Sequence, residues 1–431
     1  MRLMVAPSAE CAEFLRELQE RSGAPDAGVE ATVRGILADV RASGDAAVLA
    51  HTQRLDGVRL DAQTMRVSDA ECDAAIASLD PVVREALELA AERIAAFHAR
   101  QRRESWFVEE PGVGVLGQRV RPLHRVGLYV PGGSASYPSS VLMNAVPAKV
   151  AGVAEVVMCT PARKGRSVPP AVLAAARLAG VREVYQIGGA QAIAAMAFGT
   201  ATIRRVDKIV GPGNLYVATA KRLVFGVVGI DMVAGPSEVV VIADERAPAG
   251  WVAADLLAQA EHDPMASAIC ITPQADLARA VQAEVARQLT LLPRRTIAEQ
   301  AVSRFGAVIV VEDVAAAVRL ANTIAPEHLE LMVTDPWSLL PAVRDAGAVF
   351  LGRYTPEVAG DYMAGPNHVL PTGGTARFSS PLSVEDFQTR SSLLSLTPEA
   401  IRRWRKPVTC LAELEGLEAH ARAITLRTEE P

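Results

Sequence analysis

Residues 126–161, VGLYVPGGSASYPSSVLMNAVPAKVAGVAEVVMCTP, decide the fold of this chain. The stretch begins with a β-rich run at 126–130, continues with an Ala-rich helical run at 139–151, and returns to a β-rich run at 155–159. A strand, a helix and a second strand at this spacing predict a βαβ unit, in which the two strands run parallel.

The same alternation continues along most of the chain. Further strands are predicted at 183–187 and 208–210, with helices at 169–179, 191–197 and 216–225. A second stretch has predicted strands at 238–243, 268–271, 307–311 and 348–351. Its predicted helices lie at 248–261, 275–288 and 314–325, and Pro326 is predicted to open one more helix. Two separate stretches favour an α/β fold with two Rossmann-like parallel-sheet domains rather than one sheet.

Both ends of the chain depart from this pattern. Residues up to about 105 are predicted mostly as helix, most clearly at 78–102, where Asp80 and Pro81 provide a cap and a first turn. After residue 376, the predicted helices at 398–405 and 409–425 have no sheet of their own, so they must pack elsewhere in the protein or on another subunit. We expect a helical N-terminal segment at 1–25, a first α/β domain from 26–120 and 240–376, a second at 121–239, and an extended tail at 377–431.

The composition excludes several classes of protein. With 431 residues, of which 50% are hydrophobic and 22% charged, the chain can bury a large core and is not disordered as a whole. Its net charge of −5, without a basic run, argues against a nucleic-acid binder. Five scattered cysteines with no CxxC pair favour reduced thiols. The start does not resemble a secretory signal, and the most apolar stretch, 223–242, is interrupted too early for a membrane span, so we expect a cytoplasmic protein.

Four glycine-containing loops follow predicted strands, at 130–138, 187–191, 210–214 and 234–238. Glycine between a strand and a helix lets backbone N–H groups approach a phosphate at the helix N-terminus. None of the loops matches GxGxxG or the P-loop pattern, and any one of them alone could be a plain turn. Four together favour a nucleotide site of unusual form at the carboxyl ends of the strands.

Two pairs of polar residues lie on predicted helices. Gln259 and His262 are three residues apart, so they share a helix face and could bind a metal, although such a pair alone is more often a cap. Glu327 and His328 follow Pro326 on a predicted first turn, where the dipole favours a carboxylate and a neutral histidine. A neutral histidine beside a carboxylate is a competent general base, although Glu327 could merely complement the dipole.

Two further pairs are less informative by themselves. Asp361 and His368 lie in a loop rich in Gly and Pro, which could be functional or a solvated connector. Glu415 and His420 lie on a predicted tail helix, about 140° apart around its axis unless the helix bends nearby, and on their own indicate a solvated face. A catalytic cysteine is not favoured, because the candidate thiols fall in apolar strands, where buried cysteines are usually inert.

Taken together, these segments resemble the histidinol dehydrogenase family from about residue 30 to residue 425. The similarity is strongest in LYVPGGSASYPSSVLMNAVPAKVAGV, VDKIVGPGNLYVATAK, DMVAGPSEVVVIAD, DLLAQAEHD, PEHLEL, AGDYMAGPNHVLPT and EGLEAHARA. The resemblance implies a zinc- and NAD-dependent enzyme that oxidises L-histidinol through L-histidinal to L-histidine, the last two steps of histidine biosynthesis.

The resemblance also implies a role for individual residues. The zinc ligands fall on Gln259, His262, Asp361 and His420, the last donated by the partner subunit of a homodimer with a swapped tail. The general base falls on His328, and the acid/base that activates water falls on Glu327. Besides His328 and the metal ligands, substrate contacts fall on Ser237, His368 and Glu415, and NAD contacts on Tyr129, Gln191 and Asn214. The metal and catalytic residues thus belong to the first predicted α/β domain, and NAD binds the second.

Two other functions stay open from the sequence. A relative with the same zinc and NAD machinery could oxidise another small alcohol, although His368 and Glu415 resemble the positions with which the family recognises histidinol. A non-enzymatic binder of nucleotides or metabolites would need the glycine loops but not Glu327 and His328 beside a metal set, so these residues count against it. Neither a nucleic acid nor a membrane is expected as a partner.

Overall fold

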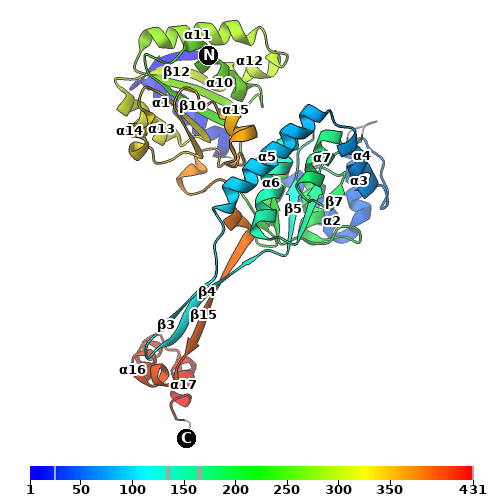
Figure 1. The fold of residues 1–431 in the computed structure, drawn as a ribbon, viewed down its shortest axis with the longest axis vertical. Coiled ribbons are helices and arrows are strands. Elements are labelled where there is room, and N and C mark those ends of the chain that lie inside the picture. Colours follow the sequence, from blue (N-terminus) through cyan, green and yellow to red (C-terminus); the bar gives the residue numbers. More distant parts are fainter. Residues whose placement is uncertain (24–25, 133–135, 163–166, 430–431) are drawn as a thin grey trace. The chain divides into compact units, whose positions relative to one another are not determined.

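The computed structural model describes residues 1–23, 26–132, 136–162 and 167–429. The chain divides into two units, the first made of Met1–Gln101 and His124–Phe387 and the second of Arg102–Leu123 and Gln388–Pro431. The first unit contains two six-stranded sheets, here called sheet A and sheet B, with helices packed against them (Figure 1). This confirms the predicted α/β class with two parallel sheets.

Sheet A has the strand order β1–β12–β11–β10–β13–β14, and all of its strands are parallel. They are β1 (Arg2–Val5), β10 (Glu238–Ala243), β11 (Ser267–Thr272), β12 (Gly306–Val310), β13 (His328–Met332) and β14 (Ala348–Leu351). The helices α10 (Ala249–Ala260), α11 (Ala275–Leu289) and α12 (Arg295–Phe305) pack on one face. The helices α1 (Ala9–Gly23) and α13 (Val314–Ile324) pack on the other. Both faces are therefore buried, which explains the nearly continuous apolar runs of these strands.

Sheet B has the order β2–β7–β6–β5–β8–β9 and is parallel except for β2. Its strands are β2 (Arg66–Val67), β5 (Arg125–Tyr129), β6 (Glu155–Cys159), β7 (Glu183–Tyr185), β8 (Lys208–Val210) and β9 (Gly229–Ile230). Its core is shared with α2 (Ala27–Ser43), α3 (Asp45–Leu55), α8 (Gly189–Phe198) and α9 (Leu215–Val224). The helices α4 (Asp69–Ala77), α5 (Pro81–Ala99), α6 (Pro138–Ala151) and α7 (Pro170–Leu178) pack against one another beside it (Figure 1).

The helices α2 to α5 pack with sheet B or with its other helices, whereas we expected residues 26–120 to belong with 240–376. The apolar face of α2, which includes Val33, Ile36 and Val40, lies in the core of sheet B, and β2 pairs with β7. An amphipathic helix reveals which of its faces is buried but not which sheet buries it, and this explains the difference. The expected N-terminal helical segment contains the helix α1, but Arg2–Val5 before it forms an edge strand of sheet A.

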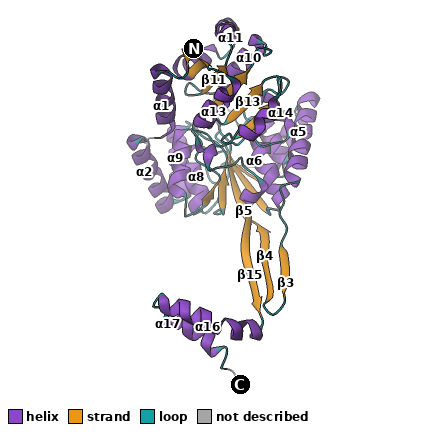
Figure 2. Cartoon of the chain, turned by 90° about the vertical axis from the view of Figure 1, so that its left-hand side faces the viewer, coloured by secondary structure: helices purple, strands orange, loops and turns teal. Residues whose placement is uncertain are grey.

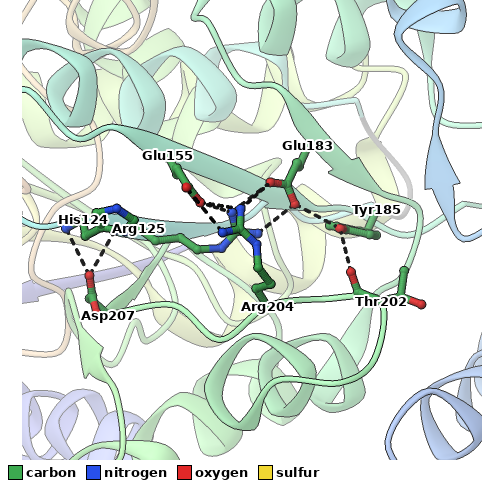
Figure 3. A network of polar contacts seen from close by, with 8 residues as sticks. All are labelled: His124, Arg125, Glu155, Glu183, Tyr185, Thr202, Arg204 and Asp207. Carbon is green, nitrogen blue, oxygen red and sulfur yellow. Dashed lines mark hydrogen bonds and ion pairs between the residues drawn. The ribbon is translucent and has the colours of Figure 1, made fainter.

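A buried arginine ties together the amino ends of β5, β6 and β7 (Figure 3). The Arg125 guanidinium donates to Glu155 at 2.5 Å and to both oxygens of Glu183 at 2.8 and 2.9 Å. Arg204 reaches the same two carboxylates from the surface, at 2.6 Å from Glu155 and 3.3 Å from Glu183. The two acidic side chains are thus shared by one buried and one exposed arginine.

The second unit is a three-stranded antiparallel sheet with two helices (Figure 2). Its strands are β3 (Trp106–Glu110), β4 (Gly114–Pro122) and β15 (Gln388–Leu396), in the order β15–β4–β3, and its helices are α16 (Pro398–Leu414) and α17 (Glu418–Leu426). The tail thus contributes one strand, β15, to a sheet whose other two strands come from residues 106–122, which the sequence analysis did not predict. Its helices are separated at Gly416 (φ +70°) rather than near residue 407. No described helix has both the length and the apolar character needed to cross a membrane.

Candidate active site

Sheet A places the predicted acid–base pair at the amino end of β13, beside the amino end of the neighbouring strand β10. Glu238 begins β10, and His328, directly after Glu327, begins the parallel strand β13, where it lies opposite Val239. Because α10 returns from the carboxyl end of β10, its last turn, which carries Gln259, comes back to this same edge. The site is therefore assembled at the amino edge of sheet A.

The prediction of a helix at Pro326 is wrong. Ala325 adopts the left-handed conformation (φ 53°) and closes α13, and Pro326 follows, as proline often does after a helix end. The next residues, HLELM, form β13, and all five are buried. A helix dipole therefore does not act on Glu327 and His328, and the neutral state of the histidine needs another cause.

His328 is a neutral base with a free ring nitrogen. Its Nδ1 lies 3.0 Å from the Glu238 carbonyl oxygen, so we assign the ring proton to Nδ1 and the lone pair to Nε2. Nε2 is buried, has no hydrogen-bond partner among the described residues, and lies 3.9 Å from Asp361 Oδ1. Burial lowers the pKa of His328 to about 3, which keeps the ring uncharged at neutral pH.

Glu327 is a buried carboxyl group beside this histidine. Its Oε2 accepts a hydrogen bond from the Glu238 N–H at 3.0 Å and lies 3.7 Å from His328 Nδ1. Burial, together with the nearby acidic groups Glu238 and Asp361, raises the pKa of Glu327 well above its ordinary value. Such a group takes up a proton readily and is suited to acid–base catalysis near neutral pH.

Three side chains converge as candidate metal ligands. His262, Glu357 and Asp361 each offer one nitrogen or oxygen atom, and these atoms lie within 4.8 Å of one another. His262 lies in the turn after α10, not on the helix as predicted, because the helix ends at Ala260 and the His262 N–H bonds the Gln259 carbonyl at 3.2 Å. Asp361 belongs to a short π-helix, Gly360–Ala364, and burial raises its pKa to about 7.

Glu357 is a site residue that the sequence analysis missed. It begins the single-turn helix α15 (Glu357–Ala359), is 2% exposed, and its Oε1 lies 3.7 Å from His328 Nδ1. The Gln259 amide lies between the Glu357 carboxylate and the Glu238 N–H, and it can donate to the first while accepting from the second at 3.0 Å. The four-residue spacing of Glu357 and Asp361, which places both on one helical face, is the pattern that could have identified it.

This donor set fits a divalent cation such as zinc. Imidazole nitrogen and carboxylate oxygen are among the usual zinc ligands. Turning the Gln259 amide would point its oxygen at the cluster, and the Glu238 N–H would keep the bond that it already donates to Glu327. Burial raises the pKa of both Glu357 and Asp361, so their ionised forms need a nearby positive charge, which a bound cation supplies.

His368 and Ser237 border the same site. His368 Nδ1 lies 4.0 Å from Asp361 Oδ1, its buried Nε2 has no partner among the described residues, and burial lowers its pKa to about 4. Ser237 is half-buried directly before β10. A cavity of about 450 Å³ opens beside His368, and its walls include His328, Asp361, His368, Phe97, Phe350 and Leu382.

The two remaining predicted site residues lie in the second unit. Glu415 directly follows α16 and His420 lies in α17, on either side of the break at Gly416. Both are exposed within the single chain. The predicted helix 409–425, on which both residues were placed, is therefore divided in two. Glu415 lies at the end of α16 and His420 lies in α17, so the two side chains do not share one helix.

Sheet B holds the three predicted NAD contacts at the carboxyl ends of its strands. Tyr129 ends β5, Gln191 lies in α8 after β7, and Asn214 caps α9 after β8. The strands β6 and β7 lie on one side of β5 and β8 lies on the other, so the strand order reverses between β5 and β8. Ligands of open α/β sheets bind at such a switch point.

The loops at this switch point are held closely. Gly211 (φ +110°) approaches β5 so tightly that a Cβ atom would meet the Tyr129 carbonyl oxygen at 2.1 Å, so only glycine fits. Lys221 Nζ donates to the Gly211 carbonyl at 2.8 Å and pairs with Asp231, which in turn accepts from the Gly211 N–H at 2.8 Å. Of the predicted loop 130–138, residues 133–135 lie outside the described residues.

All five cysteines are free thiols, and four of them are buried. Burial raises the pKa of the Cys159 and Cys270 thiols, which disfavours the reactive thiolate. Cys410, the exposed one, lies in α16. A cysteine nucleophile therefore finds no support at the site described above.

Comparisons with known proteins agree with one another. The model of the family described as histidinol dehydrogenase matches residues 19–428. The histidinol dehydrogenase of Syntrophotalea carbinolica is 55% identical over 430 residues, 100% of either chain. That of Agrobacterium fabrum is 58% identical over 400 residues, which cover 93% of this chain and 92% of its own. The crystal structure of histidinol dehydrogenase from Elizabethkingia anophelis matches with a TM-score of 0.93 at 38% identity, over 99% of this chain and 98% of that one.

Proposed function

The chain belongs to the histidinol dehydrogenase family, and from this premise we propose how its residues carry out the reaction. It is a zinc- and NAD-dependent oxidoreductase of histidine biosynthesis, which converts L-histidinol through L-histidinal to L-histidine. The observation that supports our choice of site is the convergence of His328 Nε2, Glu327 and the His262–Glu357–Asp361 cluster at one edge of sheet A. We further propose that the enzyme works in the cytoplasm.

We propose that Gln259, His262 and Asp361 of one chain, with His420 of a second chain, hold the zinc ion. When bound, zinc orients the substrate and NAD accepts the hydride of each oxidation. Ser237, His368 and Glu415 complete the substrate contacts in this proposal. His368 Nδ1 lies 4.0 Å from Asp361 Oδ1. Its Nε2 is buried and has no hydrogen-bond partner among the described residues, which supports a polar ligand in the cavity.

His328 acts as the general base in this proposal. The Glu238 carbonyl holds the proton on Nδ1, so Nε2 is free to remove the hydroxyl proton of histidinol. Glu327 then takes a proton from the water that adds to the aldehyde, which its raised pKa favours. Keeping the reactive aldehyde in an enclosed cavity until the second oxidation limits its loss to side reactions.

The NAD site is placed by this proposal at the switch point of sheet B, with contacts to Tyr129, Gln191 and Asn214. Its support is the topology, together with the buried Gln191 Oε1, which has no hydrogen-bond partner among the described residues. Sheet B then binds the cofactor, while the amino edge of sheet A provides the metal ligands and the catalytic pair. This division is the one that the sequence analysis expected for residues 121–239 and 240–376, and the proposal keeps it.

We also propose a homodimer whose sites are shared between chains. The second unit exposes large apolar side chains, including Trp106, Phe107, Leu394, Leu411 and Leu414, at 51%, 58%, 68%, 61% and 83%. Exposed apolar surface of this extent is typical of a subunit interface, and two-fold dimers are the commonest closed assembly. A second copy would cover this surface and bring Glu415 and His420 to a metal site.

The shared site can be tested by mixing two inactive variants. His262→Ala and His420→Ala should each be inactive, but in a mixed dimer one site collects both lesions and the other none. Random reassociation makes about half of the dimers mixed, so about one quarter of all sites should be active. Differential tags confirm the mixed dimers. Mixed dimers without activity would show that each site is built from one chain.

The reaction itself is tested by following NADH production from L-histidinol. Activity should disappear on complete chelation of the metal and return with added zinc, because the donor atoms have no other shared purpose. Histidine should accumulate with two NADH for each molecule formed, as the two hydride transfers require. A metal-free sample that oxidises histidinol at the full rate would refute the metal assignment.

A further inference from the structure

We propose that Arg21 positions the catalytic pair through Glu238, so that this residue of the first helix determines turnover. The inference deepens the proposed function and rests on Glu327 and His328 as the acid–base residues. Arg21 lies in α1, outside every motif that points to chemistry in the sequence.

The main chain of Glu238 holds both catalytic side chains. Its N–H donates to Glu327 Oε2 at 3.0 Å, and its carbonyl accepts from His328 Nδ1 at 3.0 Å. The second of these bonds also fixes which ring nitrogen carries the proton. A displacement of this one residue would therefore misplace the carboxylate and the imidazole together.

The side chain of Glu238 is held at both of its oxygens. Oε1 pairs with the Arg21 guanidinium, and Oε2 accepts from the Gly373 N–H at 3.2 Å. The Arg21 and Glu238 side chains are 0% and 3% exposed, so water does not screen the pair. The position of the Glu238 backbone thus depends on an arginine 217 residues earlier in the chain.

Arg21 is itself fixed on two further sides. Its Nη1 donates to the Met265 carbonyl at 2.5 Å, in the turn that follows His262. Its guanidinium lies 5.2 Å from the centroid of the Phe305 ring, in the range of a cation–π contact. One side chain therefore links α1, the start of β10 and the turn that carries a candidate metal ligand.

A role in packing alone does not account for this arrangement. Burying an arginine and a glutamate costs desolvation energy, and apolar side chains of similar size stabilise a fold as well or better. What the ion pair adds is a defined position for Glu238, whose main chain holds both catalytic groups.

The test separates positioning from stability with four variants. Arg21→Met removes the positive charge, and Arg21→Lys keeps the charge but loses the planar guanidinium group. The double variant Arg21→Met with Glu238→Met also removes the Glu238 carboxylate, which would otherwise be buried without its partner. Arg16→Met is the matched control, because Arg16 is an exposed arginine of the same helix. For each we measure zinc content, melting temperature, and kcat and KM for histidinol and for histidinal.

Arg21→Met should lower kcat about 10- to 100-fold on both substrates, as expected for a small misplacement of reacting groups. The KM for histidinol and the zinc content should change little, and Arg21→Lys should recover part of kcat. The double variant should regain the melting temperature but not kcat. Arg16→Met should match the wild-type protein.

Two results would overturn the inference. One is a wild-type kcat in metal-loaded Arg21→Met, and the other is a double variant in which kcat returns together with the melting temperature, as a purely structural pair requires. Parallel assays keep the proposals apart. If the wild-type protein fails to oxidise histidinol, or Glu327→Gln and His328→Asn leave both half-reactions intact, the proposed function is wrong, and this inference falls with it.

Discussion

Replacing Arg125 by methionine should destabilise sheet B locally and in a pH-dependent way. The change leaves Glu155 and Glu183 facing each other without the buried guanidinium (Figure 3). Breaking a fully buried ion pair costs roughly 3–5 kcal/mol. Here the carboxylates are 30% and 20% exposed and Arg204 still contacts both, so we expect about 2–3 kcal/mol.

The pKa of Glu183 gives a second measure of the same effect. The Arg125 guanidinium is the main cause that lowers this pKa to about 2 from 4.5. At about 1.4 kcal/mol per pH unit this corresponds to roughly 3 kcal/mol, which solvent screening of a partly exposed group reduces to about 1–2 kcal/mol. Because the folded pKa is lowered, the stabilisation is present above about pH 4.5 and is lost as the pH falls toward 2.

The assay is amide hydrogen exchange of peptides from β5, β6 and β7, which reads the local free energy of opening. Arg125→Met should lower that free energy at pH 7, and the difference from wild type should shrink on acidification. Arg204→Met is the matched control, because Arg204 contacts the same carboxylates with its side chain 61% exposed, and it should cost at most about 1 kcal/mol. Equal costs for the two variants, or a difference that does not change with pH, would refute the reasoning.

The remaining predictions concern the catalytic pair, the cofactor loop and the buried acids. Glu327→Gln should impair mainly the oxidation of added histidinal, whereas His328→Asn should also slow the oxidation of the alcohol by about 10²–10⁴-fold. Stopped-flow assays measure each half-reaction separately. Equal losses of rate in both half-reactions for both variants would contradict this division of roles. Lys221→Met should raise the KM for NAD with little change in kcat, because Lys221 fixes the Gly211 carbonyl at 2.8 Å beside Asn214; an unchanged KM would mean that the loop needs no such support. Burial raises the pKa of Glu330, in β13, to about 9 and that of Asp255, in α10, to about 6. The folded state therefore binds protons more tightly than the unfolded state, and the melting temperature of the chelated protein should decrease from pH 5 to pH 9. A higher melting temperature at pH 9 would contradict this prediction.

The sequence was most informative where short apolar runs form strands. The runs at 155–159, 208–210, 238–243 and 348–351 match observed strands residue for residue, because continuous apolar segments between glycine turns leave few alternatives. The segment after Pro326 was misassigned for a local reason. Proline is equally at home in the first turn of a helix and just beyond a helix end, and only the left-handed Ala325 decides between them.

The site residues that belong to recognisable sequence motifs could be predicted. Gln259, His262, Glu327, His328 and Asp361 do lie at one edge of sheet A. Arg21 and Glu238 were missed, because their contacts join residues distant in the chain, and a single acidic or basic residue at a strand or helix end has no distinctive spacing. Glu357 was missed although its four-residue spacing from Asp361 could have indicated it.

The parallel pairing of β1 with β12 also bears on how the protein is made. The strands of sheet B lie between residues 66 and 230, whereas β1 must wait for β12, which begins at Gly306. Because chains emerge from the ribosome amino end first, at roughly 5–20 residues per second, sheet B can close while the partner of β1 has not yet been synthesised. The strand β1 is thus translated long before its partner, and it is among the last strands to pair, so a tag or truncation next to Arg2–Val5 acts on a late step of assembly.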